Sequence, residues 1–299
     1  MHRFAFEDIA GQSDEDVLLK VGQGNWRAVS VTGFPVERFL DAAVQWKAAL
    51  QGVDKPWLVW CTHPDWAHVQ QRLVEDAGWT PIVGNDPRAT DIPLTKSAVR
   101  IDFNAGLDLP VLYPHVPLEF AFAWAPKLAF WHSDLLLRQA DMHALAQRFE
   151  ALEDGATIAV KPAEGRRVLL TPRKRRYWEL IGCTTAAASA DQWRAGAGWM
   201  GNFYMHPNCP SAEERVRRKR YYYDHGAGIR FWHKECGGRV ELIEEAAVSY
   251  GHFTKIGNPD YSRTVPHNSS DAGRDMREEI TRNFDLQRIV EDLDLTALL

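Results

Sequence analysis

A histidine and an aspartate interrupt one apolar segment at a spacing that suits metal binding. In residues 128–137, LAFWHSDLLL, His132-Ser133-Asp134 has apolar residues on both sides. If the segment is a strand of a parallel sheet, the two side chains lie at its carboxyl end, where such sheets bind ligands. An imidazole nitrogen and a carboxylate oxygen suit Mn or Zn better than Ca. A strand that simply ends in a polar turn would show the same pattern.

Two H-x-x-C pairs form a second candidate metal site. They are His206 with Cys209 and His233 with Cys236, and two glycines follow the second pair. Two imidazole nitrogens and two thiolates make a tetrahedral set that is typical of structural zinc. The alternative is two loop histidines and two buried free thiols.

Between these pairs, Asp224 and His225 precede a Gly-Ala-Gly run. A carboxylate and an imidazole in a loop can bind an acceptor hydroxyl, and Asp224 is then a candidate general base. The alternative is a turn in which the aspartate side chain holds its own backbone.

The elements that must position these residues alternate along the chain. Segments 27–34, 56–62 and 79–84 have the pattern of short buried strands, whereas 35–50 and 65–78 carry apolar residues at helical spacing. Strands and helices that alternate with short connections predict an α/β fold with a parallel sheet and right-handed crossovers.

The same alternation continues after an irregular stretch at 85–119. We expect a helix over 139–152, a strand over 155–162 and an amphipathic helix over 275–293. Because no linker divides the chain, we expect a single domain over 1–299.

Positive charge collects in residues 161–220, although the whole chain has a formal net charge of −5. The segment holds 13 Lys and Arg but only 5 Asp and Glu. Such a belt suits a diphosphate or a nucleic-acid backbone. A solvated surface or a charged helix face would show the same composition.

The composition excludes two other classes of protein. With 45% hydrophobic and 25% charged residues the chain is not disordered, and its four cysteines are too few and too scattered for a secreted disulfide framework. No leader pattern opens the sequence, and no apolar run approaches the roughly 18 residues that a membrane span needs. We therefore expect a cytoplasmic protein without a membrane span.

Residues 121–137, AFAWAPKLAFWHSDLLL, resemble the donor-site strand of GT-A glycosyltransferases. In that family an apolar strand runs into Asp-x-Asp, and the carboxylates hold a divalent metal that bridges the diphosphate of the sugar nucleotide. Asp134 matches the second aspartate, whereas His132 stands where the family has the first.

A second motif, residues 250–259, is similar to the His-Phe-x-Gly-x-x-Lys-Pro pattern of retaining GT-A enzymes. The resemblance implies that His252 completes the metal shell and that Lys255 meets the phosphates. Lys255 is displaced from the family lysine, and Asn258 occupies that position.

The resemblance also implies a fold and further site residues. It implies a GT-A-like, mostly parallel mixed sheet flanked by helices, with residues 162–240 as a basic, zinc-stabilised insertion on the acceptor side. Thr32 and Gly33 are then expected at the nucleotide. Trp199 is a candidate stacking platform on the acceptor side, and a core position is the alternative.

The function so implied is the transfer of a sugar from a nucleotide-sugar donor, assisted by Mn or Mg. One alternative is a zinc-stabilised nucleic-acid-binding protein that uses residues 161–220. Another is a metal-dependent hydrolase that uses His132 and Asp134, and a third is a GT-A-like scaffold without activity.

Overall fold

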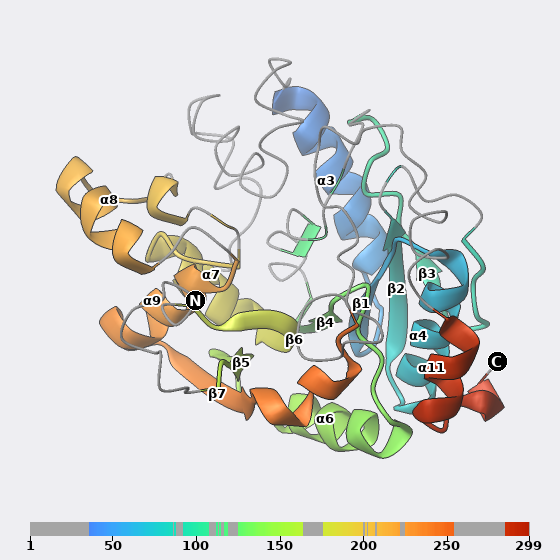
Figure 1. Cartoon of the computed structure of the whole chain (residues 1–299). Coiled ribbons are helices and arrows are strands. Elements are labelled where there is room, and N and C mark those ends of the chain that lie inside the picture. Colours follow the sequence, from blue (N-terminus) through green and yellow to red (C-terminus); the bar gives the residue numbers. More distant parts are fainter. Residues whose placement is uncertain are drawn as a thin grey trace.

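Seven strands form one mixed sheet, in the order β3-β2-β1-β4-β6-β5-β7 (Figure 1). The computed structural model describes residues 36–85, 87, 92–107, 112, 114, 117–118, 125–163, 176–199, 201, 203–206, 208–221, 225–253 and 285–298. The strands are β1 (Pro56–Cys61), β2 (Thr80–Asn85), β3 (Val99–Arg100), β4 (Lys127–Trp131), β5 (Ala156–Lys161), β6 (Trp178–Thr185) and β7 (Arg239–Glu244).

Strand β6 is the one strand of this sheet that runs against the others. The pairs β3–β2, β2–β1, β1–β4 and β5–β7 are parallel, whereas β6 is antiparallel to both β4 and β5. The fold is therefore α/β with a mostly parallel mixed sheet. Because of its direction, β6 brings its first residues to the edge at which β4 ends.

Helices cover both faces of the sheet. The α-helices are α3 (Val36–Leu50), α4 (Pro64–Asp76), α6 (Gln139–Ala151), α7 (Ala186–Arg194), α8 (Ala212–Arg218), α9 (Ala227–Glu235) and α11 (Leu286–Asp292). Short 3-10 helices are η3 (Phe203–Met205), η4 (Lys219–Tyr221), η5 (Glu245–Ala247), η6 (Ser249–Gly251) and η9 (Thr296–Leu298).

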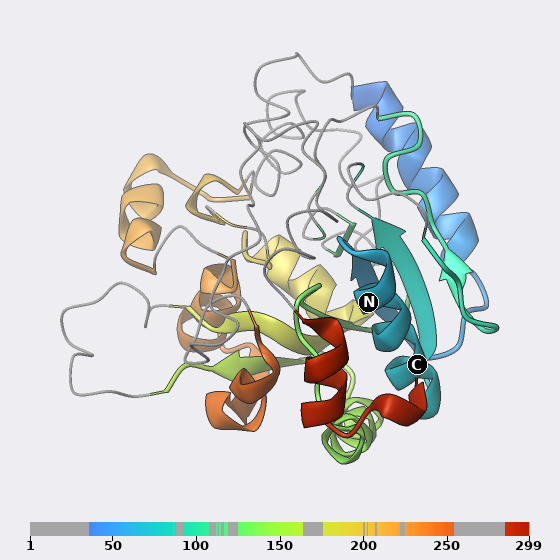
Figure 2. The same cartoon turned by 45° about the vertical axis from the view of Figure 1, so that its right-hand side comes forward.

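Alternating side chains of the strands feed two separate cores. In β1, Trp57 and Val59 pack into a core with α4, α6 and α11, and Leu58 and Trp60 pack into the opposite core with α3 and α7. Figure 2 shows α4, α6 and α11 on one side of the sheet. Both faces of β1 are buried, as expected of a strand inside a parallel sheet.

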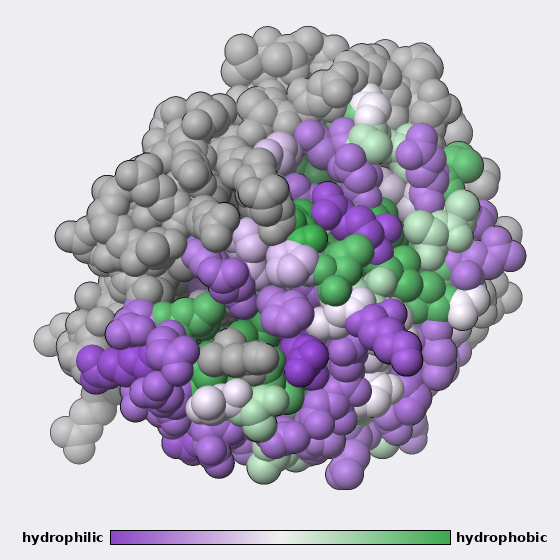
Figure 3. Space-filling model, turned by 90° about the vertical axis from the view of Figure 1, so that its right-hand side faces the viewer, coloured by the Kyte–Doolittle hydropathy of each residue, from purple (hydrophilic) through white to green (hydrophobic). Residues whose placement is uncertain are grey.

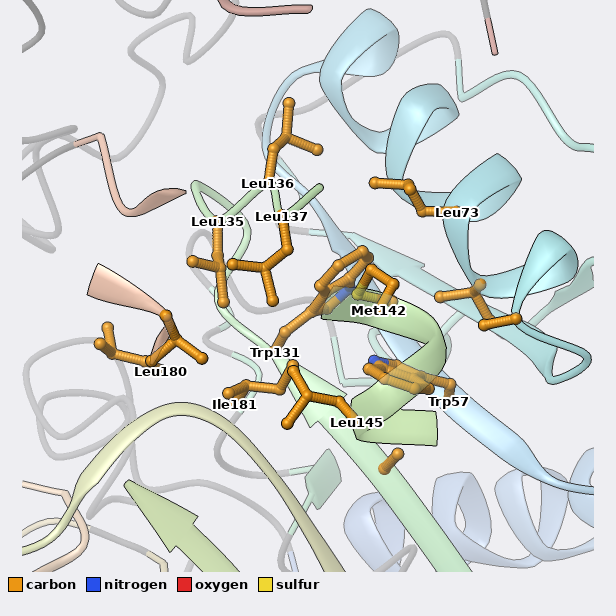
Figure 4. Packing of buried hydrophobic residues seen from close by; sticks show 14 of the residues in the cluster. Trp57, Leu73, Trp131, Leu135, Leu136, Leu137, Met142, Leu145, Leu180 and Ile181 are labelled. Carbon is orange, nitrogen blue, oxygen red and sulfur yellow. The ribbon is translucent and has the colours of Figure 1, made fainter. Parts of the chain in front are cut away.

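Trp57 belongs to the first core, and Figure 4 shows it near Trp131 and Leu145. Its ring centroid is 5.5 Å from that of Trp79, 5.5 Å from that of Trp131 and 5.0 Å from that of Phe149. These contacts tie β1 to β4 and α6, and thereby hold β4 in place.

Most of the predicted elements within the described residues are confirmed. The strands predicted at 56–62, 79–84 and 155–162 are β1, β2 and β5, and the helices predicted at 65–78 and 139–152 are α4 and α6. Helix α3 confirms the helix predicted at 35–50 from its second residue onward, since residue 35 is outside the described part.

Two other predictions fall partly or wholly outside the described residues. The strand predicted at 27–34 lies outside them, and so does the first half of the helix predicted at 275–293, whose second half is α11. The proposed insertion at 162–240 contains β6, a central strand, so part of that segment belongs to the sheet itself.

In the described part of the chain, no helix combines the length and the apolar character that crossing a bilayer requires. On the face that carries α11, hydrophilic side chains alternate with smaller apolar areas (Figure 3).

Replacement of Trp57 by alanine tests how much the aromatic core contributes to stability. The buried side chain has 0% exposure, so Trp57→Ala should lower the free energy of unfolding by about 3–5 kcal/mol. The control Val44→Ala shortens a side chain that is exposed, at 66%, and should change the free energy of unfolding by less than about 0.5 kcal/mol. Urea denaturation followed by circular dichroism measures both, and equal effects would show that the core does not depend on Trp57.

A candidate metal centre at one edge of the sheet

Three segments that are distant in the sequence meet at one edge of the sheet, namely the edge at which β4 ends and β6 begins. They are the turn after β4, the start of β6 and the loop after β7. The first two are joined by the strand pairing, which ends with Trp131 opposite Ile181 and continues as a hydrogen bond from the His132 N–H to the Leu180 carbonyl at 2.8 Å. In Figure 4 Leu180 and Ile181 lie beside the chain that leads from Trp131 to Leu135.

Backbone hydrogen bonds attach the loop after β7 to the turn after β4. Leu135 and His252 form an isolated antiparallel bridge. The Leu136 N–H donates to the Gly251 carbonyl at 3.0 Å, and the Phe253 N–H donates to the Asp134 carbonyl at 3.3 Å. The two motifs singled out in the sequence are thus neighbours in space.

Each residue of Gly251-His252-Phe253 has a separate physical role in this attachment. A Cβ on Gly251 would lie 1.8 Å from the Leu136 carbonyl oxygen, so a side chain there would prevent the close approach. The buried ring of Phe253 packs edge-on against Trp66 of α4, with 5.5 Å between the ring centroids. His252 lies between these two anchors, and its position is therefore fixed.

Gln70 of α4 fixes the turn after β4 from the other side. Its side-chain amide donates to the carbonyls of His132 and Leu135, both at 2.8 Å. Gln70 is fully buried, so these bonds form away from water. Nothing in the sequence distinguished this glutamine from the other polar residues of its helix.

The attachment brings together His132, Asp134 and His252, as the resemblance implied. One ligand atom from each lies within 4.8 Å of the other two, and this is the one such group of three or more among the described residues. The Asp134 Oδ1 atom is 3.5 Å from His132 Nδ1 and 3.2 Å from His252 Nε2.

The two separations from Asp134 are close to those expected around a shared cation. Ligand atoms about 2.1 Å from one ion are roughly 3.0–3.4 Å apart in octahedral or tetrahedral coordination. Asp134 Oδ1 is also buried without a hydrogen bond of good geometry, although buried carboxylate oxygens normally have one. Two imidazoles and one carboxylate can therefore hold a divalent ion here, and this set favours a transition metal over Ca.

The electrostatics of the group compensate for its burial. Burial acts to lower the pKa of His132, but Asp134 and Glu179 outweigh it and raise that pKa from 6.5 to about 9. Burial acts to raise the pKa of Asp134, but the charges of His252 and His132 hold it well below 3.8. In the absence of a metal the charge of the buried Asp134 carboxylate is thus compensated by the neighbouring histidines.

Glu179 and Arg176 extend the site beyond the predicted residues. Glu179 Oε1 lies 3.6 Å from His132 Nε2, and the Arg176 guanidinium donates from Nη1 to both Glu179 oxygens, at 3.2 and 2.9 Å. Burial opposes ionisation of Glu179, yet Arg176 and then His132 keep its pKa well below 4.5. A signal was present in the sequence, because Glu179 is the one charged residue in the segment WELIGCTT.

The two H-x-x-C pairs do not form a metal-binding group in the structure. All four residues are described, yet they are not among the groups of three potential ligands that lie close enough for one ion. His206 Nδ1 accepts a hydrogen bond from the Asn208 N–H at 3.0 Å, and His233 Nδ1 lies 2.5 Å from the Tyr177 hydroxyl. The structure therefore does not bring these four side chains together around one ion.

Trp199 is a core residue and not an exposed stacking platform. Its side chain has 1% exposure, its indole N–H donates to Thr184 Oγ1 at 3.1 Å, and its ring packs against Phe130. His225, the predicted acceptor contact, lies close to the site. Its Nδ1 atom is 3.2 Å from the Trp199 carbonyl oxygen, and its own carbonyl accepts a hydrogen bond from Arg176.

Four of the predicted site residues lie outside the described part of the chain: Asp224, Thr32, Gly33 and Lys255. Their roles stay predictions.

Much of the basic charge in the run 215–220 is paired within the protein. Arg217 and Arg218 bind Glu214, and Arg217 and Arg220 also bind Glu235. Arg218 is itself buried. These three arginines are therefore engaged in the fold, which weakens the interpretation of this run as a nucleic-acid surface.

Comparison of the chain with protein-family models, with curated proteins and with solved structures finds no match. The site geometry is therefore the basis for any statement about function.

Substitution of Gly251 tests whether the close approach of the loop builds the site. Gly251→Ala should displace His252 and weaken metal binding by about tenfold or more, because the new methyl group meets backbone. The control Gly52→Ala changes a glycine whose φ is +76° and which has open space around its Cβ position, so it should cost roughly 1–2 kcal/mol of stability through backbone strain without changing metal affinity. Isothermal titration calorimetry with Zn²⁺ measures the affinity of both variants. An unchanged affinity in Gly251→Ala would show that the close approach of the loop does not build the site.

The pKa of His132 predicts how metal binding depends on pH. Only a neutral imidazole binds an ion, so at pH 7 the metal must displace a proton from His132, and affinity should rise up to about tenfold per pH unit until about pH 9. The pairing of charged His132 stabilises the metal-free protein fully below pH 6.5, and this contribution is lost as the pH rises through about 9. Calorimetry in buffers of different ionisation enthalpy counts the released proton, and pH-independent affinity between 7 and 9 would contradict the prediction.

Proposed function

We propose that this protein is a metal-assisted glycosyltransferase of the GT-A type, which transfers a sugar from a nucleotide-diphosphate sugar. The observation that carries the proposal is the meeting of His132, Asp134 and His252 at one sheet edge. These residues come from the two motifs that resemble the donor site of that family and that lie far apart in the sequence. The mostly parallel mixed sheet is also consistent with the proposal.

The three residues differ in their access to solvent, which indicates how a donor would approach. The side chains of Asp134 and His252 have 7% and 3% exposure, whereas that of His132 has 26%. A diphosphate would therefore reach the bound ion from the side of His132, with Asp134 and His252 behind it. A divalent cation at this position supplies positive charge as the nucleoside diphosphate departs.

The protein would contribute positioning and charge. Gln70 and the loop after β7 hold the ligands rigidly, so little reorganisation is needed when the donor binds. Lys255, two residues beyond the described Phe253, would add positive charge for the phosphates. Asp224 and His225 are the proposed contacts for the acceptor.

A metal-dependent hydrolase is the second candidate, favoured by the number of ligands. Catalytic zinc sites commonly use three protein ligands, which leave a position for water, and His132, Asp134 and His252 provide three. Such an enzyme would consume a nucleotide sugar or phosphoester without an acceptor, whereas a transferase needs one.

Thermal stability in the presence of nucleotides tests the proposal. A nucleoside diphosphate with Mn should raise the melting temperature, since a ligand at 100 times its Kd stabilises the folded state by about 2.7 kcal/mol. UDP, GDP, CDP and their sugars are compared with and without the metal, and the rise should vanish in Asp134→Ala. The control Asp76→Ala removes an aspartate that is not a metal ligand, at the last residue of α4, and should leave the rise in melting temperature unchanged. Absence of a metal-dependent rise with every nucleotide would overturn the donor site.

A further inference from the structure

His132 lies between two buried carboxylates, and each ring nitrogen faces one of them. Nδ1 is 3.5 Å from Asp134 Oδ1, and Nε2 is 3.6 Å from Glu179 Oε1. Asp134 belongs to the group of ligand atoms that a single ion can bind, whereas Glu179 does not. The ring therefore has one nitrogen on the side of the metal site and the other on the side of Glu179.

Glu179 is itself held in a fixed and charged state. Its side chain has 9% exposure, and the Arg176 guanidinium, with 12%, donates to both carboxylate oxygens. Arg176 also donates to the His225 carbonyl at 3.1 Å. A carboxylate anchored in this way can accept a further hydrogen bond, and its Oε1 atom lies 3.6 Å from His132 Nε2.

An imidazole in a metal site needs such a partner, whereas a carboxylate does not. The two oxygens of a carboxylate are equivalent, so either one can face an ion. A neutral imidazole has a lone pair on only one nitrogen, and the hydrogen bond that the other nitrogen makes decides which one it is. A histidine where GT-A enzymes have an aspartate therefore requires a second residue to select its tautomer.

We propose that Glu179 is a positioning residue that accepts the Nε2–H of His132 and so directs the Nδ1 lone pair toward the ion beside Asp134. This inference rests on the proposed metal site and assigns to it a residue outside the ligand set. The separation of 3.6 Å is longer than a formed hydrogen bond, and bonds of this kind are often long before the ligand is bound.

Metal affinity measures the contribution of Glu179. In Glu179→Gln the side chain keeps its size but loses its charge, and Zn²⁺ should bind about 10–100 times more weakly than in the wild type. The matched control is Glu214→Gln, which also removes a carboxylate that binds arginine, here Arg217 and Arg218, far along the chain from the metal ligands. This control should leave the affinity unchanged.

Nitrogen-15 NMR of the zinc-loaded wild type tests the tautomer without any substitution. The expected spectrum has His132 protonated at Nε2 and bound to zinc through Nδ1. Binding through Nε2, or equal zinc affinity in the wild type and Glu179→Gln, overturns the inference while the metal site stands. Failure of the wild type to bind zinc or manganese overturns the inference and the proposed function together.

Discussion

The site depends on one constraint, the charge of the Asp134 carboxylate, whose side chain is buried with 7% exposure. An ionised carboxylate that leaves water without a partner costs several kcal/mol. The surrounding structure supplies partners in the form of His132 and His252, and the loop after β7 must close against β4 to bring the second of them into place. Without that closure the buried charge of Asp134 would lack its interaction with His252, so the loop and the carboxylate stabilise each other.

This arrangement makes the site depend on contacts between segments that are far apart in the sequence. The ligands come from the turn after β4 and from a segment that follows β7, which pairs with β5. Contacts between such distant segments form slowly because loop-closure entropy opposes them. The core around Trp57 holds β4 in place through the contacts of Trp57 with Trp131 and Phe149.

Much of the fold follows from local patterns, but only part of the site does. Helices α4 and α6 and strands β1, β2 and β5 were predictable because their apolar residues recur at regular spacing. His252 was predicted through a resemblance and not from spacing. Gln70 and Glu179 were missed because their roles depend on which backbone and which ring they meet after folding. The H-x-x-C pairs misled for a related reason, since His233 lies in α9, where its ring faces Tyr177, and spacing alone does not show this.

The choice of two imidazoles and one carboxylate has a consequence for the balance of charge. A divalent ion bound by neutral His132 and His252 and by ionised Asp134 keeps one formal positive charge, whereas two aspartates would leave none. The neighbouring Glu179 and Arg176 cancel each other. An anionic ligand would complete the neutralisation that the protein leaves unfinished, so ion and anion would each strengthen the binding of the other by the same factor. Departure of the anion would then loosen the ion, and the metal would exchange most readily in the interval between two anions.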